Sequence, residues 1–214
     1  MKATGFEEIA SGLRTGDVLL FSGKGFASAG IKRILGCAWS HVALVVRSAA
    51  SGRPLVLEST PCRDLIDVLT GETTGGVRLV GLSERLASFD GTIAVRRLDP
   101  ALAPAQIERL MGVLRQLHGR PYERRWLELL LSVSDRVERP RENLASLFCS
   151  ELIAEILQGI GLLDEVGREG LPSNEYTPHH FSSACDLKLK LGFAFAPEVL
   201  LDRFATTPDD HAPA

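Results

Sequence analysis

The residue best suited to nucleophilic chemistry in this sequence is Cys149. It precedes a run of apolar residues at three- and four-residue spacing, which predicts one buried face of an amphipathic helix. The residues of that face are Leu152, Ile153, Ile156, Leu157 and Ile160. We therefore predict a helix that begins at or just before Cys149, where unpaired N–H groups and the helix dipole stabilise a thiolate. Cysteine is also a common buried packing residue, so this stretch alone leaves both readings open.

A base for that thiol is found far upstream, at His41. Residues 41–46 are β-branched and apolar and predict a strand, and residues 54–60 predict the return strand after a turn. Antiparallel pairing would bring Glu58 within a residue or two of His41, where a carboxylate can fix the imidazole tautomer. His41 could equally be a core histidine, and Glu58 an edge-strand charge. Taken together with Cys149, the two residues predict a Cys–His–carboxylate triad.

The composition is that of an ordinary globular chain. The sequence has 214 residues, 45% of them hydrophobic and 24% charged, and a formal net charge of −3. We expect one domain over residues 1–204, a flexible tail over residues 205–214, and no nucleic-acid partner. The four cysteines form no CxxC pair, so we expect neither a metal site nor another cofactor.

The sequence also bears on the cellular compartment of the protein and on whether it crosses a membrane. We find no signal peptide and no segment of transmembrane length, so we expect a cytoplasmic protein without an integral membrane segment. The sequence leaves the oligomeric state open.

The elements that must position these residues are predicted from hydrophobic periodicity and from turn residues. The predicted strands cover residues 17–21, 41–46, 54–60, 77–80, 92–98 and 186–191. The predicted helices cover residues 26–35, 83–88, 104–118 and 123–138, the Cys149 helix, and a helix starting at Thr177–Pro178. The fold class is therefore α+β, with an antiparallel sheet packed against the Cys149 helix and accessory helices.

Four short motifs together resemble those of a known superfamily. The sequences GRPY at 119–122 and FCSEL at 148–152 resemble the GxPY … CSxLV element of NlpC-like cysteine peptidases. The sequences GDVLLF at 16–21 and SHVALV at 40–45 resemble their PGDLVFF … HVGIY element. In ordinary members the cysteine helix precedes the histidine strand. Here the order is reversed, as in the circularly permuted YiiX-like branch, which is related in fold to lecithin–retinol acyltransferase.

This resemblance extends roughly from Gly16 to Phe204 and implies a permuted papain-like fold. It implies that Cys149 is the nucleophile, His41 the base and Glu58 the residue that orients the imidazole. It also implies that Tyr122 helps to bind the oxyanion, beside the backbone N–H of Cys149 at the predicted start of the helix.

These roles predict a thiol hydrolase that forms a thioacyl intermediate, acting as an amidase or peptidase on small or cell-wall-type peptides. A second reading is an ester or thioester hydrolase, or an acyltransferase, acting on lipid substrates. In that reading the apolar stretch 126–131 could line an acyl groove. A third reading is a pseudoenzyme that keeps the fold to bind a ligand.

Overall fold

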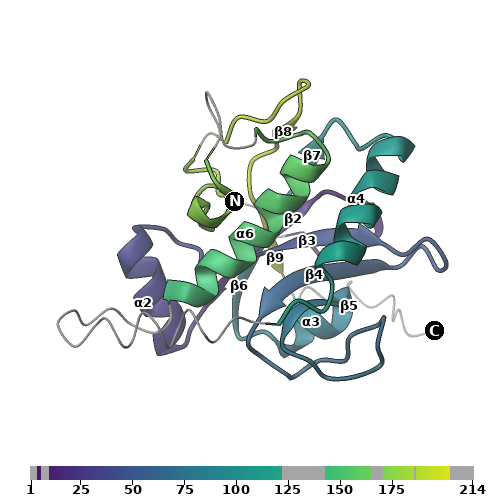
Figure 1. The fold of residues 1–214 in the computed structure, drawn as a ribbon. Helices are drawn as coiled ribbons and strands as arrows, with labels where there is room; N and C mark the ends of the chain where they lie inside the picture. Colours follow the sequence, from purple (N-terminus) through teal and green to yellow (C-terminus); the bar gives the residue numbers. More distant parts are fainter. Residues whose placement is uncertain (1–3, 6–9, 122–142, 165–170, 186, 203–214) are drawn as a thin grey trace, which may run out of the picture.

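The computed structural model describes residues 4–5, 10–121, 143–164, 171–185 and 187–202 of the chain. Its centre is a seven-stranded sheet in the order β1-β9-β6-β2-β3-β4-β5 (Figure 1). The strands are β1 (Thr4–Gly5), β2 (Val18–Gly23), β3 (His41–Arg47), β4 (Pro54–Thr60), β5 (Gly76–Gly81), β6 (Gly91–Arg96) and β9 (Val199–Asp202). Strand β1 pairs in parallel with β9, and every other neighbouring pair in this sheet is antiparallel. The predicted α+β class and antiparallel sheet are confirmed.

Helices lie on both faces of this sheet (Figure 1). The described helices are α2 (Phe26–Leu35), α3 (Leu82–Ser88), α4 (Pro104–Leu117), α6 (Asn143–Gly159) and the 3-10 turn η1 (Ser173–Glu175). A separate two-stranded sheet joins β7 (Leu98–Asp99) to β8 (Ala194–Phe195). The predicted helix over 123–138 lies outside the described residues.

Strand β2 shows why the sheet is covered on both sides. Its residues alternate between two buried clusters: Val18 and Leu20 pack with α4 and α6, whereas Leu19 and Phe21 pack with α3. All four side chains are fully buried. A strand buried on both faces carries a continuous apolar run instead of an alternating one, as this strand does.

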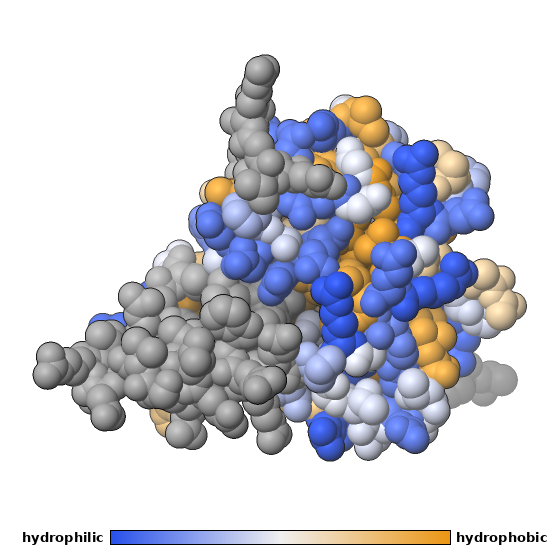
Figure 2. Space-filling model, viewed as in Figure 1, coloured by the Kyte–Doolittle hydropathy of each residue, from blue (hydrophilic) through white to orange (hydrophobic). Residues whose placement is uncertain are grey.

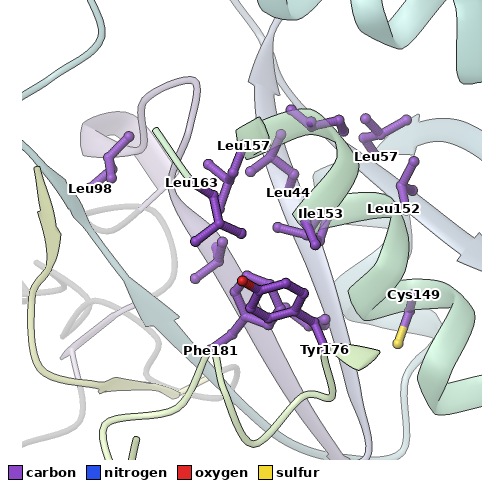
Figure 3. Packing of buried hydrophobic residues seen from close by; sticks show 14 of the residues in the cluster. Leu44, Leu57, Leu98, Cys149, Leu152, Ile153, Leu157, Leu163, Tyr176 and Phe181 are labelled. Carbon is purple, nitrogen blue, oxygen red and sulfur yellow. The ribbon is translucent and has the colours of Figure 1, made fainter. Parts of the chain in front are cut away.

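Helix α6 is the main support of the larger cluster. It packs against β3, β4, α4, η1 and α2. The apolar face predicted for this helix is buried, and Ala154 beside it is also buried. Figure 3 shows Cys149 on the same helix as Leu152, Ile153 and Leu157, at the end of the labelled apolar side chains. The helix is therefore held on several sides at once, which favours a well-defined position for Cys149.

Helix α4 separates α6 from solvent on one side. Leu110, Leu114 and Leu117 are buried, while Ile107 and Met111 pack partly buried against the same cluster. On this face of the molecule, hydrophobic residues form a narrow band between hydrophilic ones (Figure 2).

Two predicted elements near the C-terminus are wrong. Residues after Thr177 form successive tight turns instead of a helix, because the Thr177 N–H donates to Nδ1 of His180 at 3.0 Å and the following bonds span three residues. Residues 187–191 form no strand. Leu187 and Leu189 face the core while Lys188 and Lys190 are exposed, so the alternation reflects one-sided burial without a partner strand.

Shortening a side chain inside the α6 contact should cost far more stability than the same change at the surface. Ile153 is 0% exposed and Ile66 is 61% exposed. We expect Ile153→Ala to lower the free energy of unfolding by about 2–5 kcal/mol, because it removes buried methyl groups and leaves a cavity. The matched control Ile66→Ala should change it by less than about 0.5 kcal/mol in urea unfolding. Equal costs would contradict the central place of α6.

Candidate active site

His41 and Glu58 meet where two neighbouring strands stop pairing. The pairing of β3 with β4 runs from Arg47 opposite Pro54 to Leu44 opposite Leu57, and His41 and Glu58 lie beyond that last pair. Nε2 of His41 is 3.0 Å from Oε2 of Glu58. The contact expected from the strand pattern is present, although it forms past the end of the ladder and not within it.

The Glu58 carboxylate is fully buried and satisfied on both oxygens. Oε1 accepts from Nε and Nη2 of Arg78 at 3.1 and 2.8 Å, and Oε2 accepts from Nε of Arg85 at 2.8 Å as well as from His41. Burial alone would raise the pKa of Glu58, but the hydrogen bond from His41 and the charges of Arg85, His41 and Arg78 lower it well below its usual range. Glu58 is therefore ionised.

Arg78 and Arg85 are members of the site that sequence reasoning missed. Arg78 stands opposite Glu58 in the β4–β5 register and donates to Oδ1 of Asp64 at 2.8 Å. A single arginine in the buried run 77–80, one strand away from Glu58, was the signal that could have revealed it.

Arg85 reaches the carboxylate from helix α3, on a different part of the chain. Its guanidinium carbon lies 4.7 Å from the ring centre of Phe21 and 5.2 Å from that of Phe89. Contact with two aromatic rings holds a cation in place and compensates for lost water. An arginine in a short helix carries no sequence signal of such a role.

Cys149 completes the group from helix α6. Its side chain is 0% exposed and shares a hydrogen bond with the His41 side chain. Because Nε2 of His41 is held by Glu58, the other ring nitrogen, Nδ1, is the one available to the sulfur. The sequence-predicted residues Cys149, His41 and Glu58 therefore lie in one connected chain of contacts.

The His41 imidazole is biased toward its charged form. Burial lowers the pKa of His41, but the negative charge and hydrogen bond of Cys149, followed by those of Glu58, raise it to about 9. A protonated imidazole beside sulfur is the arrangement that supports a thiolate–imidazolium pair.

The three residues come from opposite faces of the sheet. Ala43 and Val45, which share the strand parity of His41, pack in the cluster beside α3, whereas Cys149 belongs to the cluster under α4 and α6. His41 is the first residue of β3, at the end where β3 and β4 are no longer paired. Its ring can therefore contact groups on both sides of the sheet.

The predicted start of the Cys149 helix is wrong. Helix α6 begins at Asn143, six residues before Cys149. The unpaired N–H groups of a helix belong to its first four residues, so the backbone N–H of Cys149 is not among them. The predicted help from the helix N-terminus, and the predicted backbone donor to an oxyanion, are therefore both incorrect. Tyr122, the other predicted oxyanion donor, lies outside the described residues.

The described residues were also compared with the requirements of a metal site and of a membrane-spanning helix. Among the residues that the structure describes, no group of three or more His, Cys, Asp or Glu side chains could hold a metal ion. None of the described helices is long and apolar enough to span a membrane.

Comparisons with known proteins identify similarity to a solved structure but to no protein-family model. No protein-family model matches the sequence, and a search of curated proteins finds no match. Among solved structures, the chain is similar to a metalloprotein, YiiX from Escherichia coli O157:H7, with 22% sequence identity and a TM-score of 0.46. The similarity covers 69% of this chain and 66% of that chain, slightly less than two thirds of its length.

Removing the Glu58 charge should strongly destabilise the protein. Glu58→Gln leaves the buried Arg85 guanidinium without the counter-charge described for it, and leaves Arg78 with the partly exposed Asp64 as its remaining described ion-pair partner. We expect it to lower the free energy of unfolding by about 3–5 kcal/mol in urea unfolding at neutral pH. The control Asp64→Asn removes a carboxylate that also contacts Arg78 but whose side chain is 45% exposed, and it should cost less than about 1 kcal/mol. If both substitutions cost the same, the buried cluster is not what holds the sheet and α3 together.

The cost of Glu58→Gln should also depend on pH. The pKa of Glu58 is lower in the folded chain than its usual value of 4.5, so the native carboxylate binds a proton less readily than the unfolded one. Its contribution to stability is present above about pH 4.5 and is lost as the pH falls toward the folded pKa. We expect the stability difference between wild type and Glu58→Gln to be constant from pH 5 to 7 and to shrink below pH 4.5. A difference that grew on acidification would show that Glu58 is protonated in the native state.

Proposed function

We propose that this protein is a thiol hydrolase of the permuted papain-like type, with Cys149 as nucleophile, His41 as base and Glu58 as orienting carboxylate. The single observation that carries the proposal is the position of the His41 ring, which contacts the Cys149 thiol on one side and the Glu58 carboxylate on the other. The raised pKa of His41 supports a charged imidazole next to the sulfur.

The reaction follows from these positions. The Cys149 thiolate attacks the carbonyl carbon, and a new carbon–sulfur bond forms as the carbonyl π pair moves to oxygen. When the tetrahedral intermediate collapses, the carbon–nitrogen bond breaks and the His41 imidazolium gives its proton to the leaving amine. Water then attacks the thioester while His41 takes its proton. The carbon–sulfur bond breaks, the acid leaves, and the thiolate–imidazolium pair is restored.

Exposure indicates from which side the substrate approaches. Cys149 is 0% exposed, whereas the side chain of His41 is 15% exposed. His41 is therefore the more exposed member of the pair, which supports an approach of the carbonyl group to the sulfur from the side of the imidazole.

The substrate class proposed is a small or cell-wall-type peptide with a scissile amide. His41 in its protonated form supplies the acid that an amine leaving group requires, since an amine does not leave without a proton. An ester or thioester leaving group has a weaker need for that proton, so the same site would also turn over such substrates.

Turnover should depend on both members of the thiol–imidazole pair. Cys149→Ala should abolish hydrolysis of a responsive peptide, and His41→Gln should reduce kcat by about 10³-fold or more, because it removes both base and acid. The control Cys185→Ala, a partly buried cysteine outside the contact chain, should keep full activity. Survival of turnover in Cys149→Ala would exclude the proposed nucleophile.

The chemistry can also be tested without a known substrate. Iodoacetamide labelling of each cysteine is followed by mass spectrometry between pH 5 and 9. Cys149 should retain reactivity at pH 6 relative to pH 9, whereas the exposed Cys62 serves as the reference thiol in the same sample. His41→Gln should abolish that retained reactivity at Cys149 only.

Parallel panels of small peptides, acyl esters and acyl thioesters then decide the substrate class, and activity confined to the ester or thioester panel would overturn the amidase assignment.

A further inference from the structure

The charge of the Glu58 carboxylate is balanced by groups outside the triad. A buried carboxylate next to a histidine normally adds negative charge that holds the imidazolium tightly. Here the same carboxylate is hydrogen-bonded by two guanidinium groups, one on each oxygen. Its negative charge is therefore already balanced before His41 is considered.

Among the described residues, the charged and titratable groups linked to His41, directly or through Glu58, lie on four elements and one loop. They are Glu58 on β4, Arg78 on β5, Arg85 on α3, Cys149 on α6, and Asp64 on the loop between β4 and β5. Asp64 is the partly exposed counter-charge of Arg78, whereas Arg85 has Glu58 as its ion-pair partner among the described residues. Arg85 is thus the cation that compensates for Glu58 on the side of His41.

Arg85 and His41 share a single oxygen. Nε of Arg85 lies 2.8 Å and Nε2 of His41 3.0 Å from Oε2 of Glu58, while Arg78 occupies Oε1. The ring of Phe21 adjoins both cations, with its centre 4.7 Å from the Arg85 guanidinium and 5.3 Å from the centre of the His41 ring. Both arginines therefore hold the Glu58 carboxylate, and Arg85 is the one that shares the oxygen facing the imidazole.

We propose that Arg85 is a positioning residue that shares Oε2 of Glu58 with His41 and offsets part of its charge, so that Glu58 orients the imidazole but holds its proton less tightly than a lone carboxylate would. This inference rests on the proposed function. An imidazolium held by an unbalanced carboxylate would give its proton to a leaving group less readily. Arg85 thus leaves His41 fixed in direction but able to transfer its proton toward the Cys149 side.

The experiment measures the titration of His41 by ¹H–¹⁵N NMR of the histidine ring in the full chain, without any substrate. In the wild-type protein we expect a raised midpoint, near 9, because Cys149 and Glu58 raise the pKa of His41. Arg85→Gln keeps an N–H donor but removes the cation, so the imidazolium loses a repelling neighbour and the midpoint should rise by about one pH unit. Arg85→Lys keeps the charge, and its midpoint should stay near the wild-type value.

A matched control separates this effect from the loss of any buried arginine. Arg96 on β6 is buried, donates to the carbonyl oxygens of Phe181, Phe195 and Ala196, and lies on a strand that β2 and β3 separate from the Glu58 strand β4. Arg96→Gln should lower stability without moving the His41 midpoint. A purely structural role for Arg85 would give the same result as this control, and a midpoint in Arg85→Gln that is unchanged or lower would overturn the proposal.

The wild-type protein provides a second test, which does not require a variant to fold. Ring ¹⁵N shifts above the midpoint should show the neutral tautomer with the proton on Nε2, facing Oε2, and a proton on Nδ1 would overturn the proposal. Neither measurement uses turnover. Loss of the hydrolase assignment, through activity that survives in Cys149→Ala, would therefore be distinguishable from failure of the Arg85 assignment.

Discussion

The structure around the site depends on burying one carboxylate. An ionised side chain moved out of water loses several kcal/mol of hydration unless nearby charges and donors replace it. Glu58 has no exposed surface, and its replacements for water come from three different elements: His41 from β3, Arg78 from β5 and Arg85 from α3. Satisfying that carboxylate therefore requires the neighbouring strands and the helix beneath them to be in place together.

This constraint links folding to chemistry. The arginines compensate for the hydration that Glu58 loses on burial, and their hydrogen bonds also orient its oxygens. Two guanidinium groups face two carboxylates, Glu58 and Asp64, so the cluster is close to neutral before the thiol and the imidazole are added. Cys149 and His41 therefore contact each other beside a cluster whose own charges are close to balanced.

The parts of the site that could be predicted from the sequence are those that follow from local patterns. Short β-branched and apolar runs on either side of a turn predicted β3 and β4, and antiparallel pairing was enough to bring Glu58 near His41. The two arginines required knowledge of neighbours across the sheet. The register places Arg78 opposite Glu58, but nothing in residues 82–88 indicates that Arg85 turns toward a buried carboxylate.

Dependence on local patterns also explains why the start of α6 and the strand predicted at 186–191 are incorrect. Apolar spacing marks which residues are buried, and it identified Leu152 through Ile160 correctly. It does not mark where a helix begins, because the turns before the apolar face need no apolar pattern of their own. It also does not show whether a segment has a strand partner, and Leu187 and Leu189 are packed against the core without one.

The arrival of sulfur and imidazole from opposite faces of the sheet has a mechanical consequence. Cys149 is held by the packing of α6 on one cluster, and the His41 ring contacts Glu58 and Phe21 on the other side. Both clusters are tightly packed, so neither side chain can move far without disturbing its neighbours. The sulfur-to-nitrogen contact is therefore sensitive to any shift of α6 relative to the sheet. It forms beyond the last described pair of β3 with β4, Leu44 opposite Leu57. The packing of the two clusters therefore holds each side chain in place. The two side chains meet where β3 and β4 are no longer paired with each other.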